Sequence, residues 1–154
     1  MTLDVGDKAP AFTGQTDGGG TVSLKALKGK KIVLYFYPKD DTPGCTTEAC
    51  GFRDALPDFS KAGAEIIGVS RDSIARHDKF KAKYDLPFPL VSDEDGAVCE
   101  AYGVWQEKKN YGKSYMGIVR SSFLIDEKGT IAAAWRNLRV KGHVEAVLEA
   151  AQKL

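Results

Sequence analysis

Two segments of the chain carry nearly unbroken runs of apolar, β-branched and aromatic residues. Residues 31–37 read KIVLYFY and stop at Pro38, and residues 65–70 read EIIGVS. Such runs are typical of strands buried on both faces of a parallel sheet. Each run is followed by a segment with helical features, over residues 43–56 and 73–84. The order strand, helix, strand, helix predicts that the two strands are parallel.

The two helices are predicted from different signals. Thr42 stands at the N-cap position of the first, and Pro43 occupies its first helical position, where a missing N–H is tolerated. Pro57 is expected to end or kink that helix. Residues 73–84 are identified by the apolar spacing of an amphipathic helix.

Weaker patterns complete the set of elements. The glycine-rich turn at residues 17–20 predicts an N-terminal hairpin at the sheet edge, and prolines limit residues 87–91 to a short strand. Residues 96–102 predict a short helix. Residues 118–125 and 130–135 predict strands joined by the turn DEKG. In residues 142–154, apolar side chains recur on one helical face: Val144, Val147, Leu148 and Ala151.

These elements predict an α/β fold with a mixed central sheet, helices on both faces and an N-terminal hairpin. The thioredoxin-like fold is the simplest match to this order. The length of 154 residues fits one domain, spanning 1–154.

The charge balance and the lengths of the apolar stretches argue against two classes of partner, nucleic acids and membranes. Lys plus Arg total 22 and Asp plus Glu total 21, so binding to nucleic acid has no support in the composition. The longest strongly apolar stretch, residues 32–37, is far short of the roughly 18 residues that a membrane helix needs. The N-terminus also lacks the core of a signal peptide. We therefore expect a cytoplasmic protein without a membrane partner.

The three cysteines are the first candidates for chemistry. Cys45, Cys50 and Cys99 are too few, and odd in number, for a complete disulfide framework. Cys45 falls at the third position of the predicted helix, where free backbone N–H groups and the helix dipole favour a thiolate. The alternative for each cysteine is a small buried hydrophobic residue. The Pro-Gly entry and the nearby Cys50 favour the reactive interpretation for Cys45.

The spacing of Cys45 and Cys50 predicts a conformational change. An ideal helix places Cα atoms five residues apart at roughly 8.5 Å, whereas a disulfide needs about 4.4 to 6.8 Å. If both thiols lie on the helix, they can form a bond only after its first turns unwind. We expect this segment to be helical when reduced and locally unfolded when oxidised.

The segment around Cys45 resembles the active site of a known family. Residues 38–45 read PKDDTPGC and match the Pro-x3-Thr-x2-Cys motif of the peroxiredoxins, thiol peroxidases with a thioredoxin-like fold. The longer strings TPGCTTEACGFRD, YGVW, RSSFLID and VKGHV are similar to the bacterioferritin comigratory protein (PrxQ) branch. This resemblance spans nearly the whole chain.

The resemblance implies a role for five residues. Cys45 would be the peroxidatic cysteine, and Cys50 the resolving cysteine found in many members of this branch. Thr42 would hydrogen-bond the thiolate and the peroxide, and Pro38 would shield the pocket from solvent. Arg120 would stabilise the thiolate and the transition state. From the residues alone, Thr42 could simply cap the helix.

Several other polar residues are set aside at this stage. The residues alone do not distinguish Arg120 from Arg136 or Arg139, or from an exposed arginine paired with a carboxylate. Glu48 is interpreted as a partner of the helix dipole. Cys99 is expected to be a buried structural thiol. His77 and His143 are interpreted as solvated or helix-end histidines, because no other ligand stands at metal-binding spacing.

We therefore expect a peroxidase that reduces hydrogen peroxide and organic hydroperoxides without metal, flavin or haem. Cys45 and Cys50 would form an intramolecular disulfide, and the family suggests thioredoxin, or alternatively glutaredoxin, as reductant. A monomer is the default and a weak dimer the alternative. Two rival hypotheses are a thioredoxin-type disulfide oxidoreductase, whose Cys-x2-Cys spacing is absent, and a redox-switched binding protein.

Overall fold

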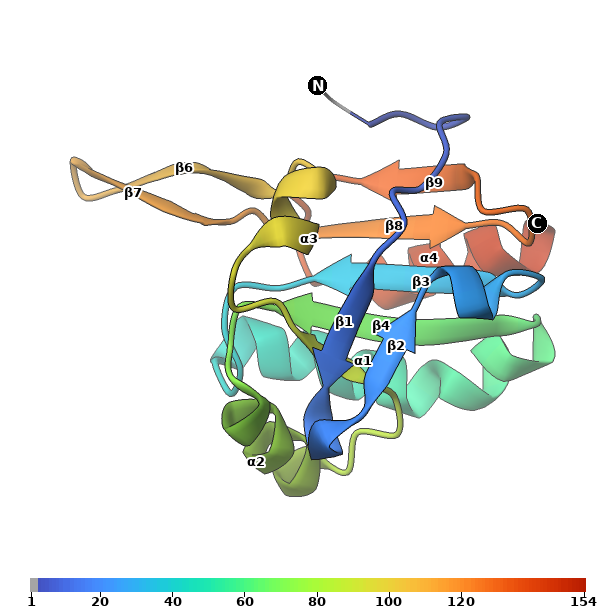
Figure 1. The fold of residues 1–154 in the computed structure, drawn as a ribbon, viewed down its shortest axis with the longest axis horizontal. Helices are drawn as coiled ribbons and strands as arrows, with labels where there is room; N and C mark the ends of the chain where they lie inside the picture. The colour runs from blue at the N-terminus through green and yellow to red at the C-terminus, as the bar shows by residue number, and fades with distance from the viewer. Residues whose placement is uncertain (1–2) are drawn as a thin grey trace.

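The computed structural model describes residues 3–154, apart from the side chain of Asn110. Its elements follow one another as shown in Figure 1. The helices are α1 (Pro43–Lys61), α2 (Ile74–Tyr84), α3 (Ala97–Ala101) and α4 (His143–Lys153), with short 3-10 turns at Asp17–Gly19 and Lys25–Leu27. The strands are β1 (Thr13–Thr16), β2 (Thr21–Ser23), β3 (Lys31–Phe36), β4 (Ala64–Ser70), β5 (Leu90–Ser92), β6 (Trp105–Asn110), β7 (Lys113–Ile118), β8 (Ser121–Ile125) and β9 (Ile131–Trp135).

Seven of the strands form one mixed sheet in the order β2-β1-β5-β4-β3-β8-β9. The strands β3, β4 and β5 are parallel, whereas β8, β9 and the β1–β2 hairpin pair antiparallel. This confirms the predicted mixed sheet and the hairpin at its edge. The central strand β3 is buried on both faces, as its apolar run predicted.

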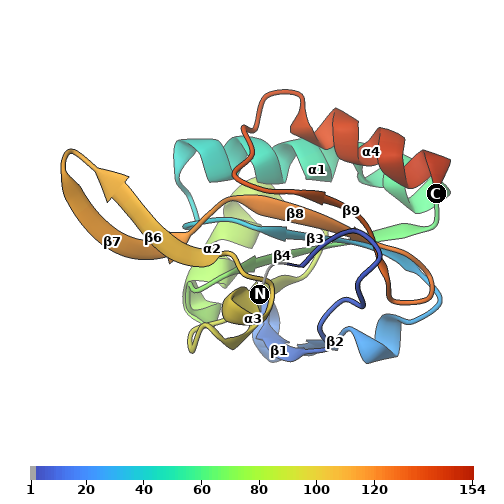
Figure 2. The ribbon, with the colours of Figure 1, turned by 90° about the horizontal axis from the view of Figure 1, so that it is seen from above.

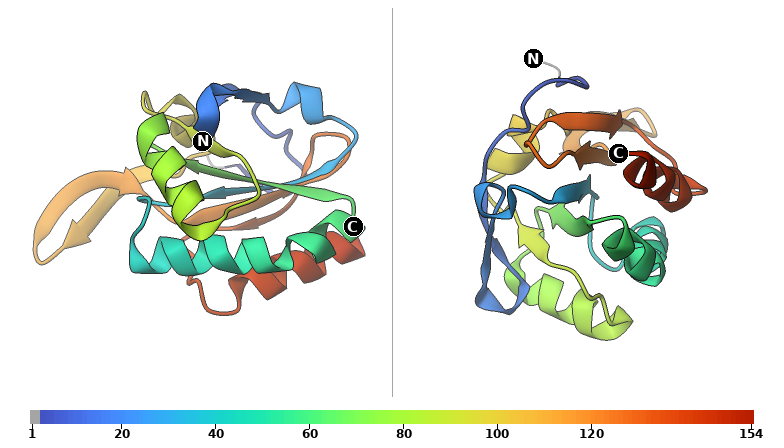
Figure 3. Two further views of the ribbon diagram at one scale, coloured as in Figure 1. Left: turned by 90° about the horizontal axis from the view of Figure 1, so that it is seen from below. Right: turned by 90° about the vertical axis from the view of Figure 1, so that its right-hand side faces the viewer.

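The sheet separates two hydrophobic cores. Alternate residues of β3 point to opposite faces, so Val33 and Tyr35 pack in one core while Ile32 and Leu34 pack in the other. Helices α1 and α4 cover the first face, and α3 lies on the opposite face (Figure 2). Helix α2 packs beside β5 and β1, near one edge of the sheet (Figure 3). No helix in residues 3–154 is long and apolar enough to cross a bilayer.

Helix α1 is longer than the sequence predicts. Of the two alternatives expected at Pro57, an end of the helix is wrong, because the helix continues to Lys61 with Pro57 inside it, and a kink there stays a prediction. Phe52 and Phe59 are fully buried on either side of the proline, so packing on the sheet holds both halves in place despite the lost hydrogen bond.

The segment between α3 and β8 also differs from the expectation. Residues 118–125 are not one strand: β7 ends at Ile118, and β8 begins at Ser121. β6 and β7 pair only with each other and project from the body as an arm (Figure 1). The arm was missed because β7 is largely exposed and shows no alternating buried face. The break between β7 and β8 contains Arg120.

Candidate active site

The sulfur of Cys45 lies at the buried beginning of α1. Cys45 is the third helical residue after Thr42 and is only 1% exposed. Its Sγ accepts a hydrogen bond from Arg120 Nη2 at 3.3 Å. A cation and the positive end of the helix dipole thus both favour negative charge on this sulfur.

Arg120 reaches the sulfur from the break between β7 and β8. Its Nη1 donates to Glu48 Oε1 at 2.7 Å, so the guanidinium bridges two residues of α1. Gly44 makes room for it, because a Cβ there would lie 3.2 Å from Nη2. Burial alone would lower the pKa of Arg120, but the nearby Glu48 and Cys45 outweigh it and raise the pKa. The structure therefore brings Arg120 to Cys45, while Arg139 is exposed.

Glu48 contacts the site through Arg120, although the sequence interpretation left it out of the site. Its side chain is completely buried, and burial raises its pKa to about 7 against the opposing effect of Arg120. Among the described residues, its Oε2 and the hydroxyl of Tyr35 are the buried side-chain atoms without a hydrogen-bond partner. Burial likewise raises the pKa of Tyr35 far above its ordinary value. The signal for Glu48 was its position three residues after Cys45, on the same helical face.

Thr42 and Pro38 lie in the loop that joins β3 to α1. Thr42 begins the helix as predicted, but its side chain makes no capping bond. Its hydroxyl instead donates to the Lys39 carbonyl at 2.9 Å. Pro38 is exposed and lines an open hollow together with Trp105 and Met116 of the arm. Their proposed roles toward a peroxide stay predictions.

Cys50 lies on the same helix as Cys45, and both thiols are free. Cys50 is half-buried, whereas Cys45 is buried. Because both residues are helical, the geometric conflict expected from their spacing applies: the helix must open before the sulfurs can bond.

Cys99 is fully buried on α3. Burial, followed by the neighbouring Asp93 carboxylate, raises the pKa of its thiol far above the ordinary value. Since the thiolate is the reactive form, this environment favours a structural role for Cys99.

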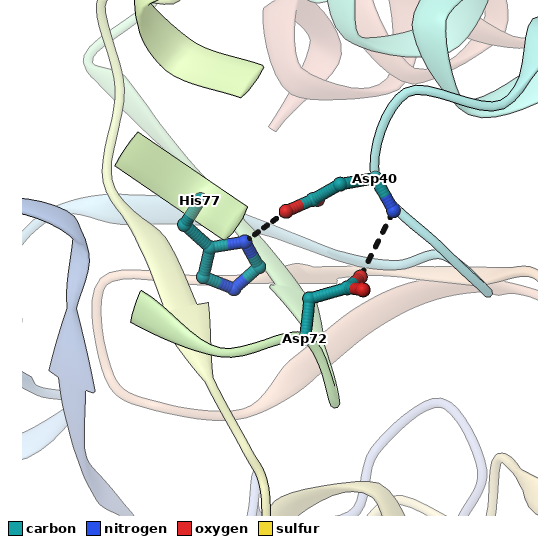
Figure 4. Close-up of side chains that lie close together, drawn as sticks. All are labelled: Asp40, Asp72 and His77. Atoms are coloured by element: carbon teal, nitrogen blue, oxygen red, sulfur yellow. Dashed lines mark hydrogen bonds and ion pairs between the residues drawn. The ribbon is translucent and has the colours of Figure 1, made fainter. Parts of the chain in front are cut away.

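The interpretation of His77 as a solvated or helix-end histidine is wrong. Its side chain lies within α2 and is fully buried, with Nδ1 2.6 Å from Asp40 Oδ2 and Nε2 2.9 Å from the Val91 carbonyl oxygen. Asp40, Asp72 and His77 are a group with ligand atoms close enough for a metal ion, and Figure 4 shows how they are arranged. Both ring nitrogens already contact protein oxygens, so we interpret the group as a hydrogen-bonded ion pair.

His143 is a helix-end residue as expected, but it is not solvated. It is the first residue of α4 and only 4% exposed, with Nε2 2.8 Å from Ser122 Oγ. Burial lowers its pKa to about 4, and the charge of Arg120 acts in the same direction. His143 is therefore neutral at physiological pH.

The fold and the site together define a thioredoxin-like protein with a buried cysteine paired to an arginine at the beginning of a helix. The AhpC/TSA family model matches residues 5–134. The chain is 57% identical over 148 residues to the putative peroxiredoxin Bcp of Coxiella burnetii, covering 96% of this chain and 98% of that protein. It is 54% identical to peroxiredoxin Bcp of Bacillus subtilis, covering 97% and 95%. The chain belongs to the AhpC/TSA family and, within it, to the Bcp peroxiredoxins.

Solved structures agree with this assignment. A variant of Xanthomonas campestris peroxiredoxin Q superimposes with a TM-score of 0.92 at 48% identity, covering 98% of this chain and 99% of that chain. A Xylella fastidiosa PrxQ variant has a TM-score of 0.94 at 40% identity, with 99% and 98% covered. These matches confirm the thioredoxin-like fold class.

Proposed function

We propose that this peroxiredoxin reduces hydrogen peroxide and organic hydroperoxides through Cys45, with Cys50 as resolving cysteine and thioredoxin as reductant. The observation that carries the proposal is the buried Cys45 sulfur, 3.3 Å from Arg120 Nη2 at the beginning of a helix. The arrangement combines a nucleophile with a fixed cation beside it, as displacement on an O–O bond requires.

The first step oxidises Cys45. The thiolate attacks the terminal peroxide oxygen, an S–O bond forms, the O–O bond breaks, and the leaving oxygen takes a proton to become water or an alcohol. Charge moves from sulfur to the leaving oxygen during this step, and Arg120 is placed to stabilise it. Thr42 would orient the peroxide once its hydroxyl turns away from Lys39.

The second step forms the disulfide. The sulfur of the Cys50 thiol attacks the sulfur of the Cys45 sulfenic acid, an S–S bond forms, the S–O bond breaks, and the leaving oxygen takes the thiol proton to depart as water. Placing both cysteines on α1 makes this step intramolecular, but it requires unwinding of the first helical turns. No second subunit is needed, which supports a monomer over a weak dimer.

The third step returns both thiols. An external dithiol reduces the disulfide by exchange and is itself oxidised. The family resemblance supports thioredoxin, with glutaredoxin as the alternative. A cytoplasmic location fits the use of cysteine as a reversible redox group. For substrate class, a Xanthomonas campestris relative 48% identical to this chain is described as having alkyl peroxide reduction activity, which supports organic hydroperoxides here.

The decisive experiment measures how fast the reduced protein reacts with hydrogen peroxide, by stopped-flow tryptophan fluorescence. We expect a rate orders of magnitude above that of free cysteine, abolished in Cys45→Ser. Cys50→Ser is the matched control: its first oxidation should persist while turnover with thioredoxin fails. A wild-type rate like that of free cysteine would contradict the proposal and favour disulfide exchange or redox switching.

Peptide mass mapping of the oxidised protein tests the resolving cysteine. We expect a disulfide between Cys45 and Cys50, with Cys99 still a free thiol. A disulfide between Cys45 and Cys99 would contradict the assignment.

NADPH consumption with a thioredoxin system, compared with a glutaredoxin system, identifies the reductant.

A further inference from the structure

The loop of residues 38–42 carries two motif residues, Pro38 and Thr42, and leads directly into the helix with Cys45. Asp41 within it has a positive φ of 58°, an unusual conformation for a residue other than glycine. Such a conformation persists only where surrounding contacts hold it. The position of Thr42 and the first turn of α1 therefore depends on what anchors this loop.

The anchor of the loop is the carboxylate of Asp40. One oxygen accepts a hydrogen bond from the Tyr37 hydroxyl at 2.6 Å, and the other lies 2.6 Å from His77 Nδ1. The backbone N–H of Asp40 donates to Asp72 Oδ2 at 2.9 Å (Figure 4). Tyr37, Asp40, Asp72 and His77, which we call the loop clamp, thus join the loop to α2 and to the segment between β4 and α2.

The protonation state of His77 follows from its partners. Asp40 Oδ2 and the Val91 carbonyl oxygen are both acceptors, so satisfying both requires a proton on each ring nitrogen. The surrounding charged and titratable groups are Asp40, Asp72 and Tyr37, with Arg76 reaching Asp72 at 3.7 Å. Burial alone would lower the pKa of His77, but the hydrogen bond and charge of Asp40 outweigh it and raise the pKa.

We propose that His77 is a positioning residue of the peroxidase site, which fixes the 38–42 loop through Asp40 so that Thr42 and Cys45 keep their orientation. The inference rests on the proposed function of Cys45. It also divides the site into two parts: the clamped loop stays in place, while the first turns of α1 unwind to let Cys50 approach. A loop held on one side returns the helix to the same starting point after each cycle.

The same loop and helix also share an exposed contact, which provides a matched control. Lys83 Nζ lies 2.9 Å from Asp41 Oδ2, and both side chains are well exposed. Exposed ion pairs of this kind contribute little. If the exposed and buried links between the loop and α2 were equivalent, Lys83→Ala and His77→Gln would change the rate of Cys45 oxidation equally. If the buried clamp positions the loop, only His77→Gln and Asp40→Asn should matter.

The test compares His77→Gln, Asp40→Asn and Lys83→Ala with the wild-type protein, each checked for folding by circular dichroism. We expect the second-order rate constant for Cys45 oxidation to fall by ~10- to 100-fold in the two clamp variants, because small misplacements of reacting groups cost about this much. Lys83→Ala should stay within about twofold of wild type. Amide hydrogen exchange in residues 39–42 should become faster in the clamp variants alone.

The pH profile separates positioning from general stability. When the pH rises through the raised pKa of His77, the ring loses a proton and can donate to only one of its two acceptors, so the wild-type oxidation rate should decline there. His77→Gln should lack this decline.

Failure of the inference and failure of the proposed function give different results. Fast oxidation in folded clamp variants, with a wild-type pH profile, would overturn the positioning role alone. A wild-type rate no faster than free cysteine would overturn the proposed function, and the positioning role with it.

Discussion

Two buried polar clusters lie next to each other in this protein, and they differ in how completely their hydrogen bonds are satisfied. In the loop clamp, both carboxylate oxygens of Asp40 and both ring nitrogens of His77 have partners. In the reactive cluster, formed by Cys45, Glu48 and Arg120, Oε2 of Glu48 has none, nor has the adjoining Tyr35 hydroxyl. The rings of Tyr35 and Tyr37 stack at 5.5 Å and connect the two clusters.

This difference matches what each cluster has to do. Each buried polar group without a partner costs about 1 to 3 kcal/mol, so such groups are expected where function requires them. In the proposed function, the reactive cluster would bind a peroxide, stabilise changing charge and then let α1 open. The loop clamp has only to hold its loop, and complete hydrogen bonding favours a single conformation.

The two buried histidines repeat the contrast. Each ring nitrogen of His77 faces an acceptor, which requires a proton on both, and the hydrogen bond and charge of Asp40 raise its pKa. Burial and the charge of Arg120 lower the pKa of His143 to about 4, so His143 stays neutral beside Ser122. The same side chain is thus charged in one cluster and uncharged next to the other, according to the charge of its neighbours.

The largest expected effect comes from breaking the reactive cluster at Arg120. In Arg120→Ala, both Cys45 and Glu48 lose their cationic partner. Removal of one preorganised donor typically lowers a rate by about 10²- to 10³-fold, and we expect this loss in Cys45 oxidation by stopped-flow fluorescence. Arg139→Ala, an exposed arginine, serves as the control and should leave the rate unchanged. Full activity in Arg120→Ala would exclude the role assigned to it.

The histidine contrast predicts opposite pH dependences of stability. His143 has a folded pKa of about 4, below its ordinary 6.5, so its contribution is present above pH 6.5 and is lost as the pH falls toward 4. The loss is on the order of 3 kcal/mol at most. For His77, whose folded pKa is raised, the contribution is present below pH 6.5 and is lost as the pH rises through the folded value.

Urea unfolding from pH 4 to 9 checks these dependences. His143→Gln should flatten the acid side of the stability curve, and His77→Gln should flatten the alkaline side. If both variants flatten the same side of the curve of stability against pH, the two clusters do not shift the pKa values of their histidines in opposite directions.

Elements with a clear local pattern could be predicted from the sequence, whereas elements without one, and contacts between distant residues, could not. The runs at residues 31–37 and 65–70 are strong signals because most of their residues are apolar, β-branched or aromatic. The arm of β6 and β7 has no such face. His77 was misinterpreted because its partner Asp40 lies 37 residues earlier in the chain, and only the tertiary fold brings them together.

The site shows the same division between local and long-range information. Cys45 and the start of α1 follow from adjacent residues, and the helical spacing of Glu48 was visible in the sequence. The contact between Arg120 and Cys45 spans 75 residues and depends on the break between β7 and β8. Only the resemblance to the peroxiredoxins singled out Arg120 beforehand.

A smaller effect is expected from Glu48→Gln. The pKa of Glu48, raised by burial to about 7, means that its contribution to stability is present below pH 4.5 and is lost as the pH rises through 7. Glutamine can still accept from Arg120 but carries no charge to desolvate. We expect the variant to lose this pH dependence and to gain about 1 to 2 kcal/mol at pH 8, because the new buried amide N–H group needs a partner and offsets part of the benefit. A less stable variant at pH 8 would show that the ion pair outweighs the cost of burial.

The smallest effect should come from Lys83→Ala, which removes the exposed counterpart of the loop clamp. The carboxylate of Asp41 accepts from Lys83 and also from the Tyr84 hydroxyl at 3.0 Å, so Asp41 itself keeps a contact to α2 in this variant. Both ions are exposed, and solvent and salt screen their attraction. We expect the thermal midpoint of Lys83→Ala to match that of wild type at low and at high salt. A thermal midpoint that falls in Lys83→Ala as much as in His77→Gln, and falls less at high salt, would contradict this expectation. It would mean that charge at the surface, rather than burial of Asp40 and His77, holds the loop.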